Sequence, residues 1–215
     1  MGQLIAVEGV DGAGKRTVID GVATELRARG AQVATLAFPR YGRSVHADLA
    51  AEALRGAHGD LAESISGMAV LFALDRSGAR DELSKLLADN DIVLLDRYVA
   101  SSAAYSAARS GQDADGEIVR WVGELEFERF ALPVPRIQLL LDIPVEVAAE
   151  RARRRAELDS TRALDSYERD AGLQYRTGAL YQQLADREWY SPWWRYRSDD
   201  DAIGLAETIT KTLSR

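Results

Sequence analysis

A glycine-rich stretch near the start of the chain has the residue types and spacing of a phosphate-binding loop. Gly9 and Gly14 enclose four residues and Lys15 follows, which matches the pattern Gly-x-x-x-x-Gly-Lys. In such a loop, backbone N–H groups and the N-terminus of the next helix point at an anion, and the lysine contacts the β- and γ-phosphates. Glycine is needed because a Cβ atom would keep the backbone away from the phosphate oxygens. We therefore predict that a nucleoside polyphosphate binds at Gly9, Gly12, Ala13, Gly14, Lys15, Arg16 and Thr17.

Two other predicted strand ends carry polar side chains that suit nucleotide chemistry. They are Phe38-Pro39-Arg40-Tyr41 and Asp96-Arg97-Tyr98. Ligands of open parallel sheets bind beyond the carboxyl ends of the strands, so these segments should meet. Asp96 has the position of an acidic residue that holds magnesium or its waters, and a helix N-cap is the alternative interpretation. Arg97 and, by the same argument, Arg40 each need an anion at the end of a buried strand, and a phosphate supplies one.

Phe72 and Arg76 form a candidate base-binding pair. They lie four residues apart in a predicted helix, so their side chains share one face. An aromatic ring can stack on a base while a guanidinium bonds its edge. Taken alone, such a pair is more typical of a core residue beside a surface residue.

A strongly basic segment, approximately residues 151–163, follows the fourth predicted strand. It contains Arg151, Arg153, Arg154, Arg155 and Arg162, whereas the whole chain has a net charge of −7. A mobile arm that closes over phosphates needs this composition, because negative charge develops on the transferred oxygens. A solvated helix face is the alternative interpretation.

The composition limits the other functions that the chain could have. Its net charge of −7 and its pI of about 5.0 argue against a nucleic acid or an anionic membrane as partner. The absence of cysteine excludes disulfides, thiolate nucleophiles and zinc–thiolate sites, and two separated histidines make a histidine metal site unexpected. No apolar run has the length of a membrane span, so we expect a cytoplasmic protein.

Alternating strands and helices are predicted to position these segments. Apolar runs predict strands at residues 4–8, 32–38, 92–95, 137–143 and 193–197. Helical spacing predicts helices at 18–29, 45–55, 61–87, 99–110, 117–130 and 165–187, with a further helix opened by Pro144 and a terminal one capped by residues 199–201 that reaches 213. This order is typical of a single α/β domain over residues 1–215, with a parallel sheet of about five strands flanked by helices.

Together these segments resemble the thymidylate kinases, the dTMP kinases among the P-loop nucleoside monophosphate kinases. The resemblance rests on residues 8–15 with Thr17, on 38–41, on 72–76 and on 96–101, and continues in Ala104-Tyr105, from Arg151 onward and in 165–169. Arg16 and the run 37–42 most resemble the mycobacterial and related actinobacterial enzymes. The resemblance implies a three-layer P-loop kinase fold with a basic lid, transfer of a phosphoryl group from ATP to dTMP with Mg²⁺, and a homodimer.

The resemblance also implies roles for individual residues. Lys15 would steady the transferred phosphates, Arg97 would bridge acceptor and donor, and Phe72 and Arg76 would stack on thymine and bond its O4 atom. Tyr105 would take the place of a ribose 2′-hydroxyl group. The implied catalytic residues are Lys15, Arg97, Asp11, Arg151 and Arg155, and the lid would bring Arg155 and Arg162 to ATP. The implied substrate contacts are Asp11, Phe38, Arg40, Tyr41, Phe72, Arg76, Arg97, Ser101, Ser102, Tyr105, Asp165 and Tyr167, and the implied metal contacts are Asp11, Asp96, Asp165 and Glu168.

The chain departs from the pattern of the family at two positions. Ser102 stands where related enzymes have asparagine, whose amide helps to read the N3 edge of thymine. Arg16 stands where a serine or threonine usually follows the loop lysine, which leaves magnesium to Asp96, Asp11 and waters. Gly12 in the loop, together with the basic segment, is similar to the family members that draw catalytic arginines from the lid.

Four other functions compete with this hypothesis. A kinase for another nucleoside monophosphate would share the fold, but Phe72, Arg76 and Tyr105 argue against it. A GTP-dependent switch lacks its guanine-reading Asn-Lys-x-Asp motif here. An ATPase without an acceptor, or non-catalytic nucleotide binding, is disfavoured by two acceptor-side arginines and a lid.

Overall fold

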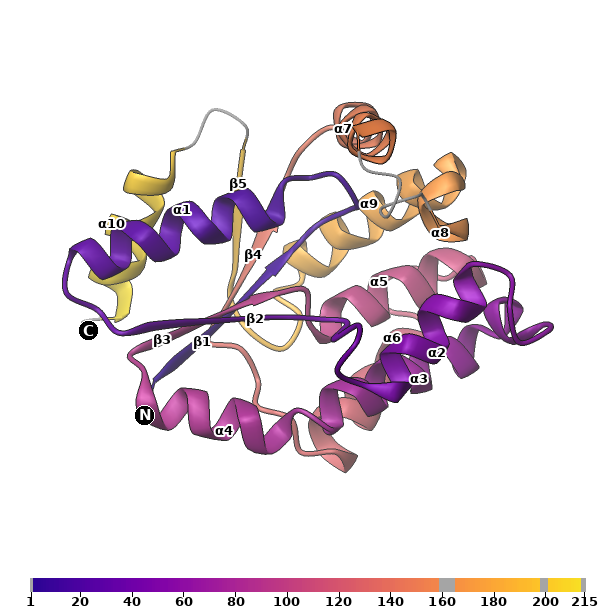
Figure 1. Ribbon diagram of the computed structural model, residues 1–215, viewed down its shortest axis with the longest axis horizontal. Helices are drawn as coiled ribbons and strands as arrows, with labels where there is room; N and C mark the ends of the chain where they lie inside the picture. Colours follow the sequence, from indigo (N-terminus) through magenta and orange to yellow (C-terminus); the bar gives the residue numbers. More distant parts are fainter. Residues whose placement is uncertain (1, 159–164, 198–200, 214–215) are drawn as a thin grey trace.

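A parallel sheet of five strands forms the centre of the molecule (Figure 1). The computed structural model describes residues 2–158, 165–197 and 201–213. The strand order is β2-β3-β1-β4-β5, and every neighbouring pair is parallel. The strands are β1 (Gln3–Glu8), β2 (Val33–Ala37), β3 (Ile92–Asp96), β4 (Ile137–Leu141) and β5 (Trp193–Tyr196). The predicted α/β class and the five-stranded sheet are therefore confirmed.

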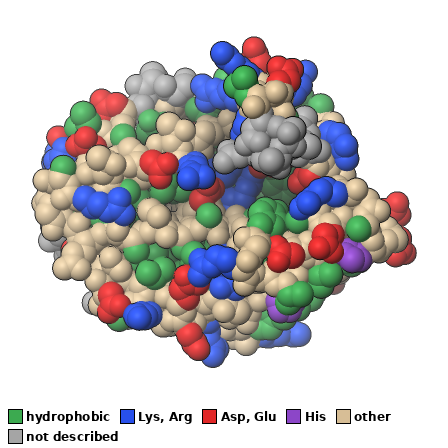
Figure 2. Space-filling view, viewed as in Figure 1, with side chains coloured by type: hydrophobic (Ala, Val, Ile, Leu, Met, Phe, Trp, Pro, Cys, Tyr) green, Lys and Arg blue, Asp and Glu red, His purple; other side chains and the backbone are tan. Residues whose placement is uncertain are grey.

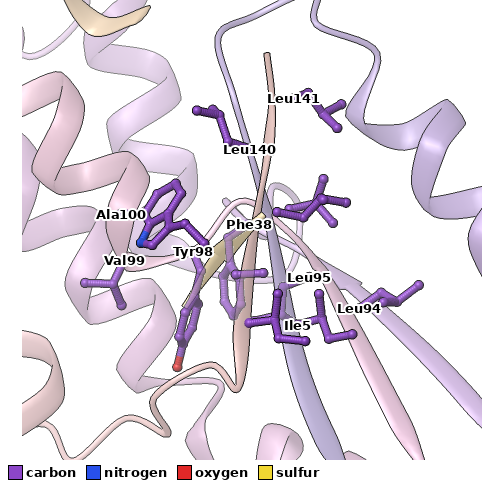
Figure 3. Close-up of a cluster of buried hydrophobic side chains, with 14 of the residues drawn as sticks. Ile5, Phe38, Leu94, Leu95, Tyr98, Val99, Ala100, Leu140 and Leu141 are labelled. Carbon is purple, nitrogen blue, oxygen red and sulfur yellow. The ribbon is translucent and has the colours of Figure 1, made fainter. Parts of the chain in front are cut away.

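The central strands are buried on both faces, which explains their continuous apolar sequences. In β3 the four residues before Asp96 are buried, and all five residues of β4 are buried. Figure 3 shows side chains of β1, β3 and β4 packed with Phe38 and Tyr98, which follow β2 and β3. The carboxyl ends of these strands thus lead directly from the core into the segments predicted to carry chemistry.

Helices cover both sides of this sheet and give the molecule three layers. Helices α1 (Lys15–Ala28) and α10 (Ala202–Leu213) pack together on one side, and α4 (Arg80–Asp89) and α5 (Val99–Ser110) lie on the other (Figure 1). The remaining helices are α2 (Val45–Leu54), η1 (Leu61–Glu63), α3 (Ile65–Ser77), α6 (Glu117–Gly123), η2 (Glu124–Arg129), α7 (Val145–Leu158), α8 (Ser166–Arg169) and α9 (Ala171–Asp186). No helix in these described ranges is long and apolar enough to cross a membrane.

The single helix predicted over residues 61–87 is wrong, because the structure divides it into η1, α3 and α4. The two main pieces bury their apolar faces in different places. Met68 of α3 packs with Leu54 of α2, whereas Leu83 and Leu87 of α4 belong to the main core beside the sheet. One straight helix cannot serve both clusters, so the chain turns at Gly78.

Two other predicted helices are also interrupted. The helix predicted over 165–187 is divided at Asp170, whose side chain accepts a hydrogen bond from Leu173 N and so caps α9. Aspartate competes in this way for backbone N–H groups and favours a helix start over a helix interior. The helix predicted over 117–130 continues as the π-helix η2, in which Phe130 N donates to Leu125 O at 3.0 Å.

Candidate active site

The loop between β1 and α1 has the geometry of a phosphate-binding loop. Gly9, Gly12 and Gly14 have φ angles of 145°, 81° and 92°, in the region that L side chains rarely adopt. At Gly12 a Cβ atom would also lie 1.9 Å from the carbonyl oxygen of Ala148 in α7. Glycine at position 12 is therefore required twice, by its own backbone angle and by the close approach of α7.

Lys15 opens α1, and its ammonium group is held against the loop. Its Nζ atom donates to the carbonyl oxygens of Gly9 and Val10, both at 3.0 Å, and its side chain is buried. Burial and, next, the positive charge of Arg97 lower the pKa of Lys15 to about 8. An anion that contacts Nζ would stabilise the charged form of this amine.

Arg97 lies where the phosphate loop and the strand ends meet. Its backbone takes the left-handed conformation, with φ of 63°, which is uncommon for a residue other than glycine and frequent at functional sites. The guanidinium donates to Gly9 O at 3.1 Å and to Ser101 Oγ at 3.2 Å, and it forms an ion pair with Asp11. These contacts bring together the first turn of α5, the loop and an acidic side chain.

A buried network of hydrogen bonds stabilises this arrangement. Glu8, at the end of β1, is fully buried, and its carboxylate accepts from Tyr98 N at 2.8 Å and from Ser101 Oγ at 2.7 Å. Tyr181 of α9 donates to the same carboxylate and lies 3.3 Å from Arg97 Nη1. Burial raises the pKa of Glu8. Tyr181 is not among the residues predicted from the sequence, because no motif marks it within a long amphipathic helix.

A cavity extends from Arg97 between α3, α5 and α8. Figure 2 shows a hollow beneath α7, with basic side chains at its base and hydrophobic ones at its edge. The apolar part of the cavity wall includes Leu54, Ile65, Met68 and Ala69. The cavity also contains the following predicted substrate residues: Asp11, Phe38, Tyr41, Phe72, Arg76, Arg97, Ser101, Ser102, Tyr105, Asp165 and Tyr167.

Arg40 is the predicted substrate residue that does not line this cavity. Its Nε atom donates to Asp75 Oδ1 at 2.9 Å, its Nη2 atom to Asp75 O at 2.7 Å, and its Nη1 atom lies 3.4 Å from Glu82. The anion that an arginine needs at this strand end is therefore a carboxylate of the protein. Arg40 connects the segment after β2 to α3 and α4.

The cavity contains a buried arginine at the end of α3. Arg76 is 2% exposed, and it forms a bidentate ion pair with Glu126 of η2, which is 0% exposed. Arg76 Nη2 also donates to Ser102 Oγ. Burial lowers the pKa of Arg76, but the charge of Glu126 outweighs it and the net pKa is raised. Glu126 is not among the residues predicted from the sequence, since nothing distinguishes it among the acidic residues of its segment.

Two tyrosines form another wall of the cavity. The rings of Tyr105 and Tyr167 are stacked with centroids 5.9 Å apart, and Tyr105 OH donates to Asp11 Oδ2 at 2.7 Å. Arg109 lies over the ring of Tyr167 at 4.9 Å and donates to the carbonyl oxygens of Ala62 and Glu63. Arg109 thus connects α5 to η1 and α8, a role that only the folded chain reveals.

The basic residues 151–155 lie on α7, directly above the phosphate loop. Arg151 is exposed, and its Nη1 atom lies 3.9 Å from the position that a Cβ atom would take at Gly14. Arg155 Nη2 donates to Glu168 Oε1 at 2.7 Å. The third predicted lid arginine, Arg162, lies outside the described residues.

The acidic residues predicted to contact a metal lie around the same region. Asp165 caps α8, and burial raises the pKa values of Asp165 and Glu168, to which the charge of Asp11 adds. For Asp11, burial is outweighed by Arg97 and Lys15, so its pKa lies below its usual range. Asp96 is partly exposed at the end of β3.

These acidic side chains fit a magnesium ion that arrives with a nucleotide. Within the described ranges, no three acidic or histidine side chains converge on one metal position. Mg²⁺ does not need such a group, because it is usually bound by one or two carboxylates together with phosphate oxygens and waters. Burial and the negative charge of Asp11 raise the pKa values of Asp165 and Glu168, and a cation would offset both effects. Arg16 and Thr17 are exposed on the first turn of α1, and Arg16 lies 3.8 Å from Asp20.

Comparison with known proteins agrees with this geometry. The family model described as thymidylate kinase matches residues 7–191. Thymidylate kinase of Mycobacterium tuberculosis (strain H37Rv) is 55% identical over 206 residues, which cover 96% of each chain. Thymidylate kinase of Akkermansia muciniphila is 35% identical over 99% of this chain and 92% of its own, and a probable thymidylate kinase of Archaeoglobus fulgidus is 32% identical over 75% of each. The structure joins a phosphate loop to a cavity that contains a buried arginine, and the chain belongs to the thymidylate kinase family.

Proposed function

We propose that this phosphotransferase, which phosphorylates dTMP to dTDP for dTTP synthesis, binds dTMP in the cavity and ATP on the phosphate loop. The observation that carries this assignment is the position of Arg97. Its guanidinium contacts the loop carbonyl of Gly9 and also lines the cavity, so one side chain can contact both phosphates. Direct transfer of a phosphoryl group requires this arrangement, with the phosphoryl donor on one side of Arg97 and the phosphoryl acceptor on the other.

The walls of the cavity suit a pyrimidine deoxynucleotide. Phe72 presents an aromatic ring on which the base can stack, and Arg76 presents N–H donors to the O4 atom of thymine. Tyr105 is bonded to Asp11 and stacked on Tyr167, so its ring is held in place at the cavity wall, where it would exclude a ribose 2′-hydroxyl group. Ser101 and Ser102 line the cavity and would contact the edge of the base, and Phe38 and Tyr41, which also line it, would contact the sugar and phosphate.

The transfer step is supported by charge and positioning. An oxygen of the dTMP phosphate forms a bond to the γ-phosphorus while the bond from that phosphorus to the β-phosphate oxygen breaks, and ADP leaves with the charge. The acceptor is already an anion, so no strong general base is required. Lys15, Arg97, Arg151 and Arg155 neutralise the developing charge, and Arg162 would join them from the lid.

Magnesium belongs to this proposal. Asp11, Asp96, Asp165 and Glu168 would hold the ion directly or through its waters. When bound, Mg²⁺ neutralises charge on the ATP phosphates and orients them. The residues of the chain keep the acceptor in place, while Asp11 holds Arg97 and Tyr105 in their positions.

An acceptor screen tests the assignment. ADP release is measured with ATP and Mg²⁺ and with dTMP, dUMP, dCMP, UMP, CMP, AMP, GMP or water alone. We expect turnover to be far faster with dTMP than with the other acceptors. A preference for another monophosphate would refute the thymine pocket, and release without any acceptor would indicate an ATPase.

A cytoplasmic homodimer is also part of the proposal. Half-buried apolar side chains of η1 and α3, including Leu61 and Leu71, give this side of the molecule a surface on which a second copy could pack. Light scattering on the purified protein measures its mass. A monomer at enzyme-assay concentrations would contradict the dimer without affecting the assignment of the cavity.

A further inference from the structure

Glu126 is a buried acidic residue whose carboxylate, among the residues that the structure describes, hydrogen-bonds to Arg76 alone. Its carboxylate is 0% exposed and receives Nε and Nη2 of Arg76, the latter at 2.7 Å. The two residues are 50 positions apart in the chain. Bidentate pairing of this kind specifies the plane and the direction of a guanidinium.

The ion pair with Glu126 decides which N–H groups of Arg76 remain available to a ligand. A guanidinium has five N–H groups, one on Nε and two on each terminal nitrogen. Glu126 receives Nε and Nη2, and Ser102 Oγ receives Nη2 as well. No described residue bonds to Nη1, and Arg76 lines the cavity. The donors of Nη1 are therefore the ones that a bound base can use.

The local backbone explains how a carboxylate reaches this position. Glu126 and its neighbour Phe127 are both buried, although they point to different environments. Phe127 packs against Tyr98 at 6.3 Å in the core, whereas Glu126 meets Arg76. Both lie in the π-helix η2, and π-turns of this type occur frequently at functional sites.

We propose that Glu126 is a positioning residue for base recognition, which aims Nη1 of Arg76 at the 4-position of the pyrimidine. A guanidinium only donates hydrogen bonds, so in this orientation it donates to the 4-keto oxygen of thymine or uracil. It opposes the 4-amino group of cytosine, which would leave two donors facing each other. This inference rests on the proposed function, because it assumes that the base occupies the cavity beside Arg76.

The chain contains a matched control for the loss of a buried ion pair. Asp75 precedes Arg76 in the same helix, is 1% exposed, and bonds to Arg40 with Nε–Oδ1 of 2.9 Å. Neither Asp75 nor Arg40 lines the cavity. Asp75→Asn therefore breaks a comparable pair at the adjacent position without touching the edge of Arg76.

The experiment measures kcat and KM for dTMP and dCMP, KM for ATP, and the melting temperature. For Glu126→Gln we expect the preference for dTMP over dCMP in kcat/KM to fall by at least about tenfold, with KM for ATP within about twofold. Asp75→Asn should lower the melting temperature but keep the dTMP/dCMP ratio. If both variants lose the same preference, or neither does, Glu126 does not position the base contact.

A double-mutant cycle separates positioning from the base contact itself. In an Arg76→Met background, Glu126→Gln should cause no further loss of preference, because Glu126 acts through Arg76. Additive losses would overturn the inference and leave the proposed function intact. An unchanged preference in Arg76→Met alone would instead refute the proposed base contact.

A second variant covers the case in which Glu126→Gln does not fold. Glu126→Asp keeps the charge but shortens the side chain by one methylene group, so it should pull Nη1 away from the base. We expect a smaller loss of the dTMP preference in the same direction. A melting temperature lowered with the preference intact would show that Glu126 serves stability alone.

Discussion

The acceptor cavity and the phosphate loop hold their positive charges in different ways. In the cavity, Arg76 is enclosed in the protein and paired with a buried carboxylate. At the loop, Lys15 is bonded to two backbone carbonyl groups, and Arg155 of α7 shares an ion pair in which its side chain is 39% exposed.

This difference suits the nucleotides that we propose for the cavity and for the loop. Breaking a buried ion pair costs about 3–5 kcal/mol, whereas an exposed pair contributes about 0–1 kcal/mol. The cavity therefore presents a fixed donor pattern and can discriminate between bases. The partly exposed Arg155 above the loop can exchange its present partner for phosphate oxygens at small cost, which suits a ligand that must be bound, transferred and released.

The largest effect on turnover should come from Arg97, which contacts the phosphate loop and also lines the cavity. Arg97→Ala removes the guanidinium that contacts the loop and lines the cavity, so we expect turnover to fall by about 10³-fold or more. KM for ATP should change little, because the lost interaction matters most in the transition state. Single-turnover measurement of ADP formation checks this, and unchanged turnover would remove Arg97 from the mechanism.

A test of the loop backbone is Gly12→Ala. The added Cβ atom meets Ala148 O at 1.9 Å, so α7 must move, and we expect a loss of about 3 kcal/mol in unfolding free energy. Gly59→Ala is the control, since Gly59 also has positive φ (64°) but has nothing within 4 Å of its Cβ position. Its cost should be about 1 kcal/mol. Thermal or urea denaturation measures both unfolding free energies. Equal losses in Gly12→Ala and Gly59→Ala would show that α7 does not constrain the loop.

On the acceptor side, Phe72→Ala removes the stacking surface. KM for dTMP should rise by about tenfold, and KM for ATP should remain unchanged. Steady-state kinetics with each substrate varied in turn provide the measurement. A matching rise in KM for ATP would mean that Phe72 does not belong to the acceptor pocket alone.

The pH dependence of ATP capture tests the state of Lys15. Its pKa is lowered to about 8, so the free enzyme loses this positive charge as the pH rises through 8. We expect kcat/KM for ATP to decrease above that pH, while kcat decreases only at higher pH, because bound phosphates favour the protonated amine. Lys15→Arg should abolish this decrease whatever its residual activity. A decrease that persists in this variant would assign it to another group.

The smallest effect should come from the ion pair below α7. Glu168→Gln removes the partner of Arg155, and we expect the unfolding free energy to change by less than about 1 kcal/mol because the arginine is partly exposed. Glu126→Gln should cost about 3 kcal/mol or more. If the two variants lose similar amounts of unfolding free energy, the ion pairs of the cavity and of α7 do not differ in the way described above.

Much of the fold and of the site was predictable because it depends on local chemistry. Glycine at positive φ identifies the phosphate loop, and the apolar runs of β1, β3 and β4 indicate strands buried on both faces. Three residues of the predicted strand ends, Phe38, Tyr41 and Arg97, line the cavity. The helix breaks at Gly78 and Asp170 were missed, since they depend on which cluster each helix packs against.

The residue types and their spacing alone determined the α/β class, the phosphate loop and the strand ends that border the cavity. Only the tertiary structure decided which acidic side chain pairs with which arginine. Asp75 is next to Arg76 in sequence but bonds to Arg40, while Arg76 bonds to Glu126 fifty residues away. Adjacent residues on a helix point in different directions, so an ion pair is chosen by the elements that pack on each face.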